Sequence, residues 1–154
     1  MAKKPNKKDH QEKDTNKVSS FQLKNKMLKF FNHLIDVPLH SEQAVARNRI
    51  SKLVKEKFDE FEADRLDLIE KYAKRDDKKE KMLDEKGENF LLEDQEAFER
   101  DWEILRSQEA VFDVLPSNRQ YWRTIRDVVK NTKLEMDIEL TDMWEDLLEA
   151  LKSI

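Results

Sequence analysis

The sequence contains no cysteine, only one glycine (Gly87) and three prolines. Without cysteine there is no disulfide framework, no thiol nucleophile and no cysteine-based zinc site. One glycine is too few for doubly wound nucleotide folds, phosphate-binding loops and β-sandwiches, which need glycine at tight turns and beside phosphates. The sequence also lacks any run of about 18 apolar residues, so we expect no membrane span.

Charged residues are abundant, at 42% of the 154 residues against 38% hydrophobic ones. Residues 1–57 hold 14 Lys and Arg against six Asp and Glu, whereas residues 58–154 hold 16 against 28. Length and composition predict one mostly helical domain that stays in the cytosol where it is made or enters a particle assembled there. The two charged parts can attract oppositely charged partners, including a second copy, although solvated surfaces are the simpler interpretation.

The first 17 residues are predicted to be a separate segment. After Ala2 they contain no apolar side chain, so they cannot bury enough surface to offset the entropy lost on ordering. Their basic start is not followed by the apolar stretch of a signal peptide. We therefore expect residues 1–17 to be a flexible basic arm. Residues 18–154 are predicted to form a single, mainly α domain, with a helical hairpin over 18–76 and a small α+β cap over 77–154.

Two amphipathic helices are expected to build the hairpin. Met27, Phe30 and Leu34 recur at helical spacing and predict a first helix over residues 21–35. The second helix, over residues 41–74, would be about 50 Å long at about 1.5 Å per residue. The shorter helix cannot cover it, so its far part is expected to meet the C-terminal region or a second subunit.

The second helix carries a long apolar stripe. Its members recur at helical spacing: Ile50, Leu53, Val54, Phe58, Phe61, Leu66, Leu68, Ile69 and Tyr72. Arg65 interrupts this stripe, and we interpret it as paired with Glu62 or another acid, or as extending its head group to solvent. Self-association along the helix predicts that the stripe is only partly buried within one copy.

The remaining sequence alternates charged turns with shorter elements. Gly87 lies in a charged joint where a turn favours positive φ, and the apolar residues on either side predict a short hairpin over 82–92. The other predicted elements are helices over 94–107 and 117–130, strands over 110–114 and 134–140, and a final helix capped by Thr141 or Asp142. Ser117 and Gln120 have the spacing of a capping box.

A longer pattern begins at Pro38-Leu39 and continues through the second helix. Its matching positions are Arg47, Arg49, Lys52, Leu53, Glu56, Lys57, Glu62, Arg65, Leu66, Leu68, Tyr72 and Ala73, and the segment EAVFDV follows at 109–114. In these residues the chain resembles a family of small phage and prophage proteins of Gram-positive bacteria. The resemblance implies a phage context, a long central helix and an acidic C-terminal part. It implies no activity and no catalytic residue.

The sharpest local feature is a row of four cations: Arg119, Arg123, Arg126 and Lys130. Steps of four, three and four residues put all of them on one side of the helix predicted over 117–130. Aligned arginines can follow phosphates, because the guanidinium fork matches phosphate geometry. The same row can instead meet an acidic partner or pair with acidic helices of this chain, and the sequence leaves these alternatives open.

A second basic cluster, Arg47, Arg49 and Lys52, lies near the start of the long helix. At this spacing the three side chains spread around the helix instead of lining one side. Together with the lysines within residues 24–29, they are a weaker candidate for nucleic-acid contact.

The functional expectation is a non-enzymatic interaction protein. We expect it to bind a protein partner, either a host factor or a virion or assembly component, with self-association as one form of this. No motif for catalysis, a cofactor or a metal ion is visible, and carboxylates are too abundant for a catalytic pair to be picked out. The alternative is a nucleic-acid-binding accessory protein that uses the basic arm and the arginine-rich helix.

Overall fold

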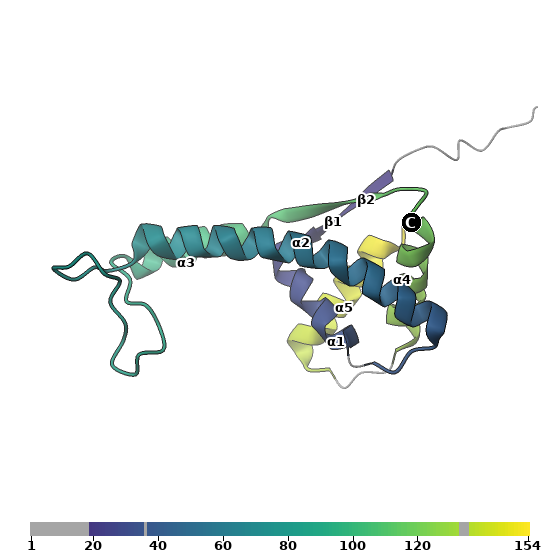
Figure 1. Cartoon of the computed structure of the whole chain (residues 1–154), viewed down its shortest axis with the longest axis horizontal. Coiled ribbons are helices and arrows are strands. Elements are labelled where there is room, and N and C mark those ends of the chain that lie inside the picture. Colours follow the sequence, from purple (N-terminus) through teal and green to yellow (C-terminus); the bar gives the residue numbers. More distant parts are fainter. Residues whose placement is uncertain (1–18, 36, 133–135) are drawn as a thin grey trace, which may run out of the picture.

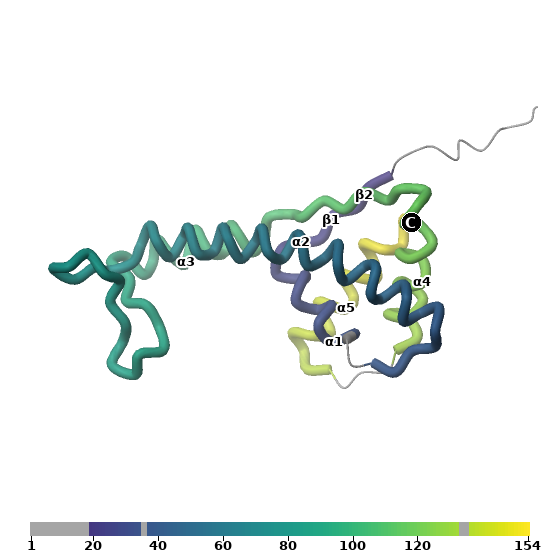
Figure 2. Tube along the Cα trace, in the orientation of Figure 1, coloured from purple at the N-terminus to yellow at the C-terminus, as the bar shows by residue number. Residues whose placement is uncertain are grey.

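The computed structural model describes residues 19–35, 37–132 and 136–154, and the predicted flexible arm lies outside this part of the chain (Figure 1). Helices account for most of the described residues and accompany a two-stranded sheet. A body contains the sheet and most of the helices, while two helices project from it and end in a cluster of loops (Figures 1 and 2). The predicted class, mainly α with a small α+β part, is confirmed.

The sheet joins the beginning of the described chain to a late segment. β1 (Ser19–Lys24) pairs antiparallel with β2 (Glu109–Val114), with Phe21 opposite Phe112. Burial alternates along both strands, so one face of the sheet packs into the core. The late strand is therefore confirmed. The predicted first helix is wrong at its start, because Phe21 and Leu23 follow the two-residue period of a strand whose partner lies far along the chain.

The rest of the predicted first helix is mostly a 3₁₀-helix. η1 (Asn25–Phe31) continues directly from β1 and passes into the single-turn helix α1 (Asn32–Ile35). The predicted apolar face is nevertheless confirmed, since Met27, Phe30 and Leu34 are all buried. The backbone is thus a 3₁₀-helix where an α-helix was predicted, but the residues predicted to face the core do so.

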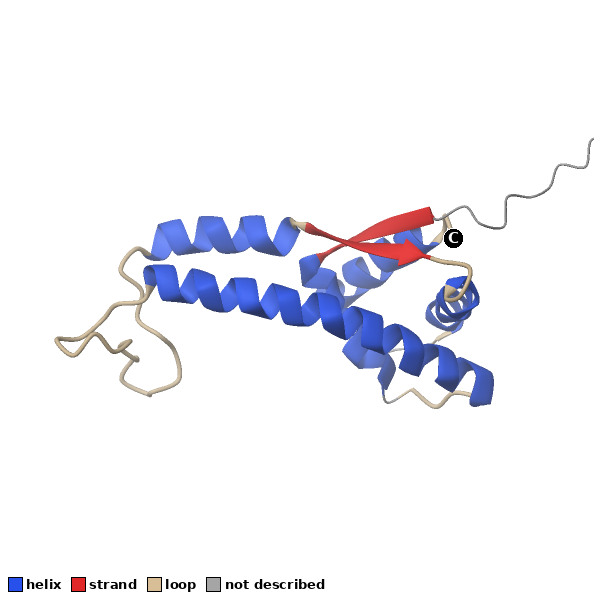
Figure 3. Cartoon of the chain, turned by 45° about the horizontal axis from the view of Figure 1, so that its top comes forward, coloured by secondary structure: helices blue, strands red, loops and turns tan. Residues whose placement is uncertain are grey.

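The long helix is present as predicted. α2 (Ser41–Tyr72) ends two residues before the predicted boundary at residue 74. Its first part lies along α4 in the body, and its last part runs antiparallel to α3 (Gln95–Ser107), which matches the helix predicted over 94–107 (Figure 3). We call residues 57–72 of α2 together with α3 the stalk. The far part of α2 thus meets a later segment of its own chain.

Aromatic contacts hold the two helices of the stalk together. Near the body, the ring of Phe61 stacks on that of Trp102 at 5.5 Å between centroids. Near the far end, Tyr72 meets Phe98 edge to face at 6.0 Å. The contacts join two neighbouring turns of α3 to Phe61 and Tyr72 of α2, so the stalk is a packed helical pair and not a bare extension of α2.

Asn25 fastens the stalk to the body. Its Nδ2 donates a hydrogen bond of 2.9 Å to the carbonyl oxygen of Leu105, and its backbone N–H donates one of 2.8 Å to that of Gln108. Carbonyl groups in the last turn of a helix lack partners within the helix. Asn25 therefore satisfies the end of α3 and fixes where the stalk leaves η1.

α4 (Arg119–Asn131) begins close to the predicted position but without the predicted cap. The capping box of Ser117 and Gln120 is wrong, because Asn118 is the N-cap residue. The side chain of Asn118 accepts a hydrogen bond of 2.8 Å from the N–H of Leu115 and does not cap the helix. It thereby stabilises the turn that leads from β2 into α4.

α5 (Ile138–Leu151) begins inside the segment predicted as a strand. Asp137 caps it by accepting a hydrogen bond of 2.8 Å from the N–H of Leu140. The predicted strand is therefore wrong over 136–140, where the chain forms no strand and turns into this helix. Residues 134 and 135 of that prediction lie outside the described residues. The predicted caps, Thr141 and Asp142, are helical residues, because an apolar face of period 3.6 prevails over the short alternation before it.

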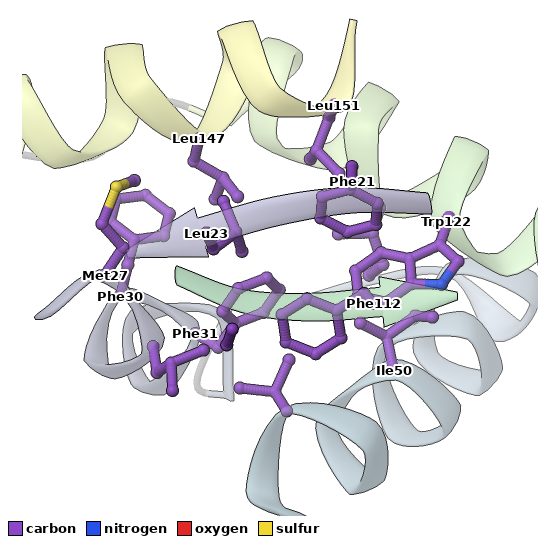
Figure 4. Close-up of a cluster of buried hydrophobic side chains, with 14 of the residues drawn as sticks. Phe21, Leu23, Met27, Phe30, Phe31, Ile50, Phe112, Trp122, Leu147 and Leu151 are labelled. Carbon is purple, nitrogen blue, oxygen red and sulfur yellow. The ribbon is translucent and has the colours of Figure 1, made fainter. Parts of the chain in front are cut away.

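The core lies between the sheet, α2, α4 and α5 (Figure 4). Trp122 of α4 is fully buried, and its ring lies 4.7 Å from that of Phe21 and 5.3 Å from that of Phe112. Leu147 and Leu151 of α5 are also fully buried in this core, and Figure 4 shows them on the helix that covers it on the side away from Ile50 of α2. One ring from α4 thus joins both strands to the helices.

Candidate interaction surfaces

The row of cations predicted on α4 is partly used within the fold. Arg126 donates from Nη1 to the carbonyl oxygen of Ile154 at 2.7 Å and lies 3.5 Å from the carboxylate of Asp127. Arg119 is half-buried and also has an interaction partner. Arg123 and Lys130 are exposed. Arg126 anchors the C-terminus to α4, so only part of the row faces outward.

The second basic cluster divides in the same way. Arg47 donates from Nη1 to the carbonyl oxygens of Val37 at 2.8 Å and Leu34 at 3.3 Å. It therefore holds the connection between α1 and α2. Arg49 and Lys52 are exposed on α2 and do not share this contact. The structure thus assigns a packing role to one member and leaves two on the surface.

The apolar stripe of α2 is mostly covered within one copy. Ile50, Val54, Phe61 and Ile69 are buried, and Leu66, at 53%, is the one exposed member of the stripe. Arg65 pairs with Glu62 at 2.9 Å, as predicted. Because α3 and α4 cover the stripe, little of it remains for self-association along this helix.

The most distinctive surface is the far end of the stalk. We call residues 73–94, which connect α2 to α3, the tip. Three extended segments of the tip hydrogen-bond to one another through their backbones: the N–H of Lys74 donates to Leu91, that of Leu91 to Met82, and that of Met82 to Lys74, at 2.8–2.9 Å. This closed arrangement fixes the backbone of the tip although it contains no regular strand or helix.

Two tight turns complete the tip. In the first, the carboxylate of Asp76 accepts hydrogen bonds from the N–H groups of Lys78 and Glu80. In the second, the carboxylate of Asp84 accepts from the N–H of Glu88, and Gly87 has a φ of 67°. The predicted positive φ of this glycine is confirmed. Carboxylates that accept backbone N–H groups pre-form both turns.

The tip exposes three large apolar side chains, which we call the tip patch: Met82 at 38%, Leu83 at 47% and Phe90 at 40%. Leu83 and Phe90 are partners in an antiparallel bridge, which places their side chains on one face. Apolar side chains held on a rigid, projecting surface are typical of binding sites. The tip patch is therefore the strongest candidate for a binding surface among the described residues.

Charged groups fix the base of the tip. Glu70 accepts from Lys81 at 2.6 Å and also pairs with Arg75. The hydrogen bond from Lys81, followed by the attraction of both cations, lowers the pKa of the Glu70 carboxyl. The ammonium of Lys81 also lies 5.4 Å from the ring centre of Phe90. Lys81 thus connects the end of α2 to the tip patch.

A second ionic contact clamps the far end of the stalk. Asp101 of α3 accepts hydrogen bonds from the hydroxyl of Tyr72 at 2.6 Å and from Lys71 at 3.2 Å. The hydrogen bond from Tyr72, and then that from Lys71, lowers the pKa of the Asp101 carboxyl. The contact joins α2 and α3 immediately before the tip.

We expect this clamp to loosen in acid. A carboxyl whose pKa is depressed by folding stabilises the fold fully above its unfolded pKa of about 3.9 and loses that contribution as the pH falls through its folded pKa. A carbon-13 NMR titration of Asp101 should give a midpoint below that of an ordinary aspartate. In Tyr72→Phe the midpoint should rise. An identical Asp101 titration in both proteins contradicts this role for the Tyr72 hydroxyl.

Comparison with known proteins adds no family to these observations, since no family model, curated protein or solved structure matches the chain. None of the helices among the described residues has both the length and the apolar character needed to cross a membrane. The candidate surfaces are therefore ranked by their own geometry.

Sequence reasoning singled out cations and missed the tip patch. The signal was present in part, because Met82-Leu83 and Phe90 flank the glycine turn as the predicted hairpin requires. The sequence cannot show that the turn lies at the end of a projecting helical pair. If the same loop packed against the body, these apolar residues would be buried in the core.

Proposed function

We propose that this chain is a non-enzymatic protein that binds a protein partner through the tip patch at the end of its stalk. The observation that carries the proposal is the placement of Met82, Leu83 and Phe90 on an ordered surface that projects from the body. Apolar and aromatic anchors at the centre of a contact supply most of the binding free energy of protein interfaces.

The construction of the stalk supports this proposal. The aromatic contacts along α2 and α3, the Asp101 clamp and the hydrogen-bonded backbone of the tip all restrict motion of the tip patch. A surface that is ordered before binding loses less conformational entropy when a partner arrives. Charged neighbours such as Lys81 surround the apolar centre, in the manner of a polar interface rim.

The resemblance to phage and prophage proteins indicates where to look for the partner. We propose a host factor or a virion or assembly component, in the host cytoplasm or in the particle. Self-association is a further form of the same proposal, with the tip patch rather than the α2 stripe as the contact.

The test compares a tip variant with a matched body variant. Leu83→Ser/Phe90→Ser removes exposed apolar side chains from the tip, and Val111→Ser/Ile138→Ser removes apolar side chains from the body that are at least as exposed. Each protein is used to capture partners from nuclease-treated host lysate, and its mass is measured by light scattering. We expect the tip variant to retain about tenfold less of a specific protein, or to lose oligomers, while the body variant behaves like wild type. Equal capture and equal mass for all three proteins would refute the proposal.

A second function, nucleic-acid binding, is favoured by one observation: Arg123 and Lys130 remain exposed on the same side of α4. Binding through these cations should fall steeply with salt, because phosphate contacts release counterions. In that case Arg123→Glu/Lys130→Glu abolishes retention on DNA or RNA, whereas the tip variant does not change it. Salt-insensitive absence of binding by wild type would eliminate this alternative.

A further inference from the structure

A pocket of about 310 Å³ lies where the stalk meets the body. It is bounded by η1, α1, the middle of α2, α3 and the beginning of α5. The lining residues used below are Lys26, Lys29, Phe61, Trp102, Arg106, Asp137 and Glu139, and His33 of α1 also lines the pocket. The pocket shares no residue with the tip, so a ligand here is independent of the proposed protein partner. Its volume is at the lower end for small-molecule sites, enough for a compact ring system with one substituent.

An aromatic pair forms one wall of this junction pocket. The rings of Phe61 and Trp102 are stacked, with 14° between their planes. Phe61 is buried, whereas Trp102 is only half-buried, so the indole has surface left for another planar group. Within the described part of the chain, the indole N–H of Trp102 also donates no hydrogen bond. The wall therefore offers both a stacking surface and a free donor.

Three cations line the pocket near this wall. Lys26 and Lys29 are three residues apart in η1, and a 3₁₀-helix places such residues directly above one another on one side. Neither lysine is in an ion pair with a carboxylate among the residues that the structure describes. Arg106 has only a long contact with Glu103, at 3.4 Å. These positive charges are available to an anion.

Two carboxylates oppose these cations in the pocket lining. Asp137 is occupied as the N-cap of α5, where it accepts the N–H of Leu140. Glu139 is exposed and has no such role. The excess of positive charge over negative charge favours an anionic ligand, and Glu139 should weaken its binding.

We propose that the junction pocket binds a small aromatic phosphate, with its ring against Trp102 and its phosphate held by Lys26 and Lys29. A dianionic phosphate matches two aligned and unpaired ammonium groups, and Arg106 extends the same positive wall. The aromatic pair explains why a ring is required in addition to the charge. Phenyl phosphate carries the minimal chemistry, and adenosine monophosphate carries the same chemistry on a larger ring system.

The tryptophans provide the readout for the test. Proton–nitrogen NMR resolves three indole signals, of Trp102, Trp122 and Trp144. Trp122 is fully buried and Trp144 donates to the carbonyl oxygen of Val129, so both are internal controls. Phenyl phosphate or adenosine monophosphate should shift the Trp102 signal selectively at millimolar concentration or below. Inorganic phosphate and adenosine, which each lack one half of the ligand, should bind more weakly.

Variants of the charged lining residues test whether the pocket prefers an anion. Lys26→Ala/Lys29→Ala should weaken binding of the aromatic phosphate about fivefold or more, and Glu139→Gln should strengthen it. Lys24→Ala, which removes a neighbouring lysine outside the pocket, should leave it unchanged. The proposal is overturned if neither probe shifts Trp102, if the two lysines are dispensable, or if Glu139→Gln weakens binding. The backbone NMR spectrum of each variant verifies that it remains folded.

Discussion

Trp122→Ala is expected to lower the free energy of unfolding by about 3–5 kcal/mol, the range for removal of a large aromatic side chain from a packed core. Trp122 is fully buried and contacts the rings of Phe21 and Phe112, one from each strand. Its removal leaves a cavity where α4 meets the sheet, and the strands have no other ring of this size between them and α4. Urea unfolding monitored by circular dichroism measures the change.

Two controls make this expectation specific. Arg123→Ala alters the next residue on the exposed side of α4 and should change stability by no more than about 0.5 kcal/mol. Trp122→Phe should cost less than Trp122→Ala, since it keeps a ring in place. The indole N–H of Trp122 is buried without a hydrogen-bond partner among the described residues, which costs free energy in wild type. Phenylalanine has no such group, so removal of this cost offsets part of the packing free energy that Trp122→Phe loses. A cost below about 1 kcal/mol for Trp122→Ala would contradict this view of the core.

Phe61→Ala is the second change with a large expected effect, about 3 kcal/mol or more. Phe61 is buried between Phe58 and Trp102 at the place where the stalk leaves the body. Its loss removes the stacking contact that joins α2 to α3, so α3 should lose protection against hydrogen exchange before the body does. Hydrogen exchange with mass spectrometry on peptides from residues 95–107 and 119–131 separates the two regions.

Leu66→Ala is the matched control for this prediction. Leu66 lies five residues later on the same helix but is 53% exposed, so its truncation should change stability by about 0.5 kcal/mol or less. Equal exchange in α3 of wild type and Phe61→Ala would show that the stalk does not depend on the aromatic pair. Phe61→Ala should also disrupt the junction pocket, because the ring of Phe61 supports the wall of that pocket.

The helices that carry long amphipathic patterns could be predicted from the sequence alone. α2, α3 and α4 lie close to their predicted positions, because residues three and four apart determine a helical face regardless of what covers it. The pairing of Arg65 with Glu62 and the positive φ of Gly87 are equally local, since each depends on neighbours within a few residues. The alternation of exposed and buried residues along β2 could also be predicted, because it follows from the order of neighbouring residues in that strand.

Tertiary structure alone decided the rest. Phe21 and Leu23 lie in a strand because β2 supplies a partner some 90 residues later. An alternation of two apolar residues is too short to distinguish a strand from the start of an amphipathic helix. The start of α5 depends on the Asp137 cap and on burial of Leu147, which prevail over a short alternating pattern. Both candidate sites have the same origin. The tip patch is exposed because α2 and α3 project together, and the junction pocket exists because η1, α1, α2, α3 and α5 meet there.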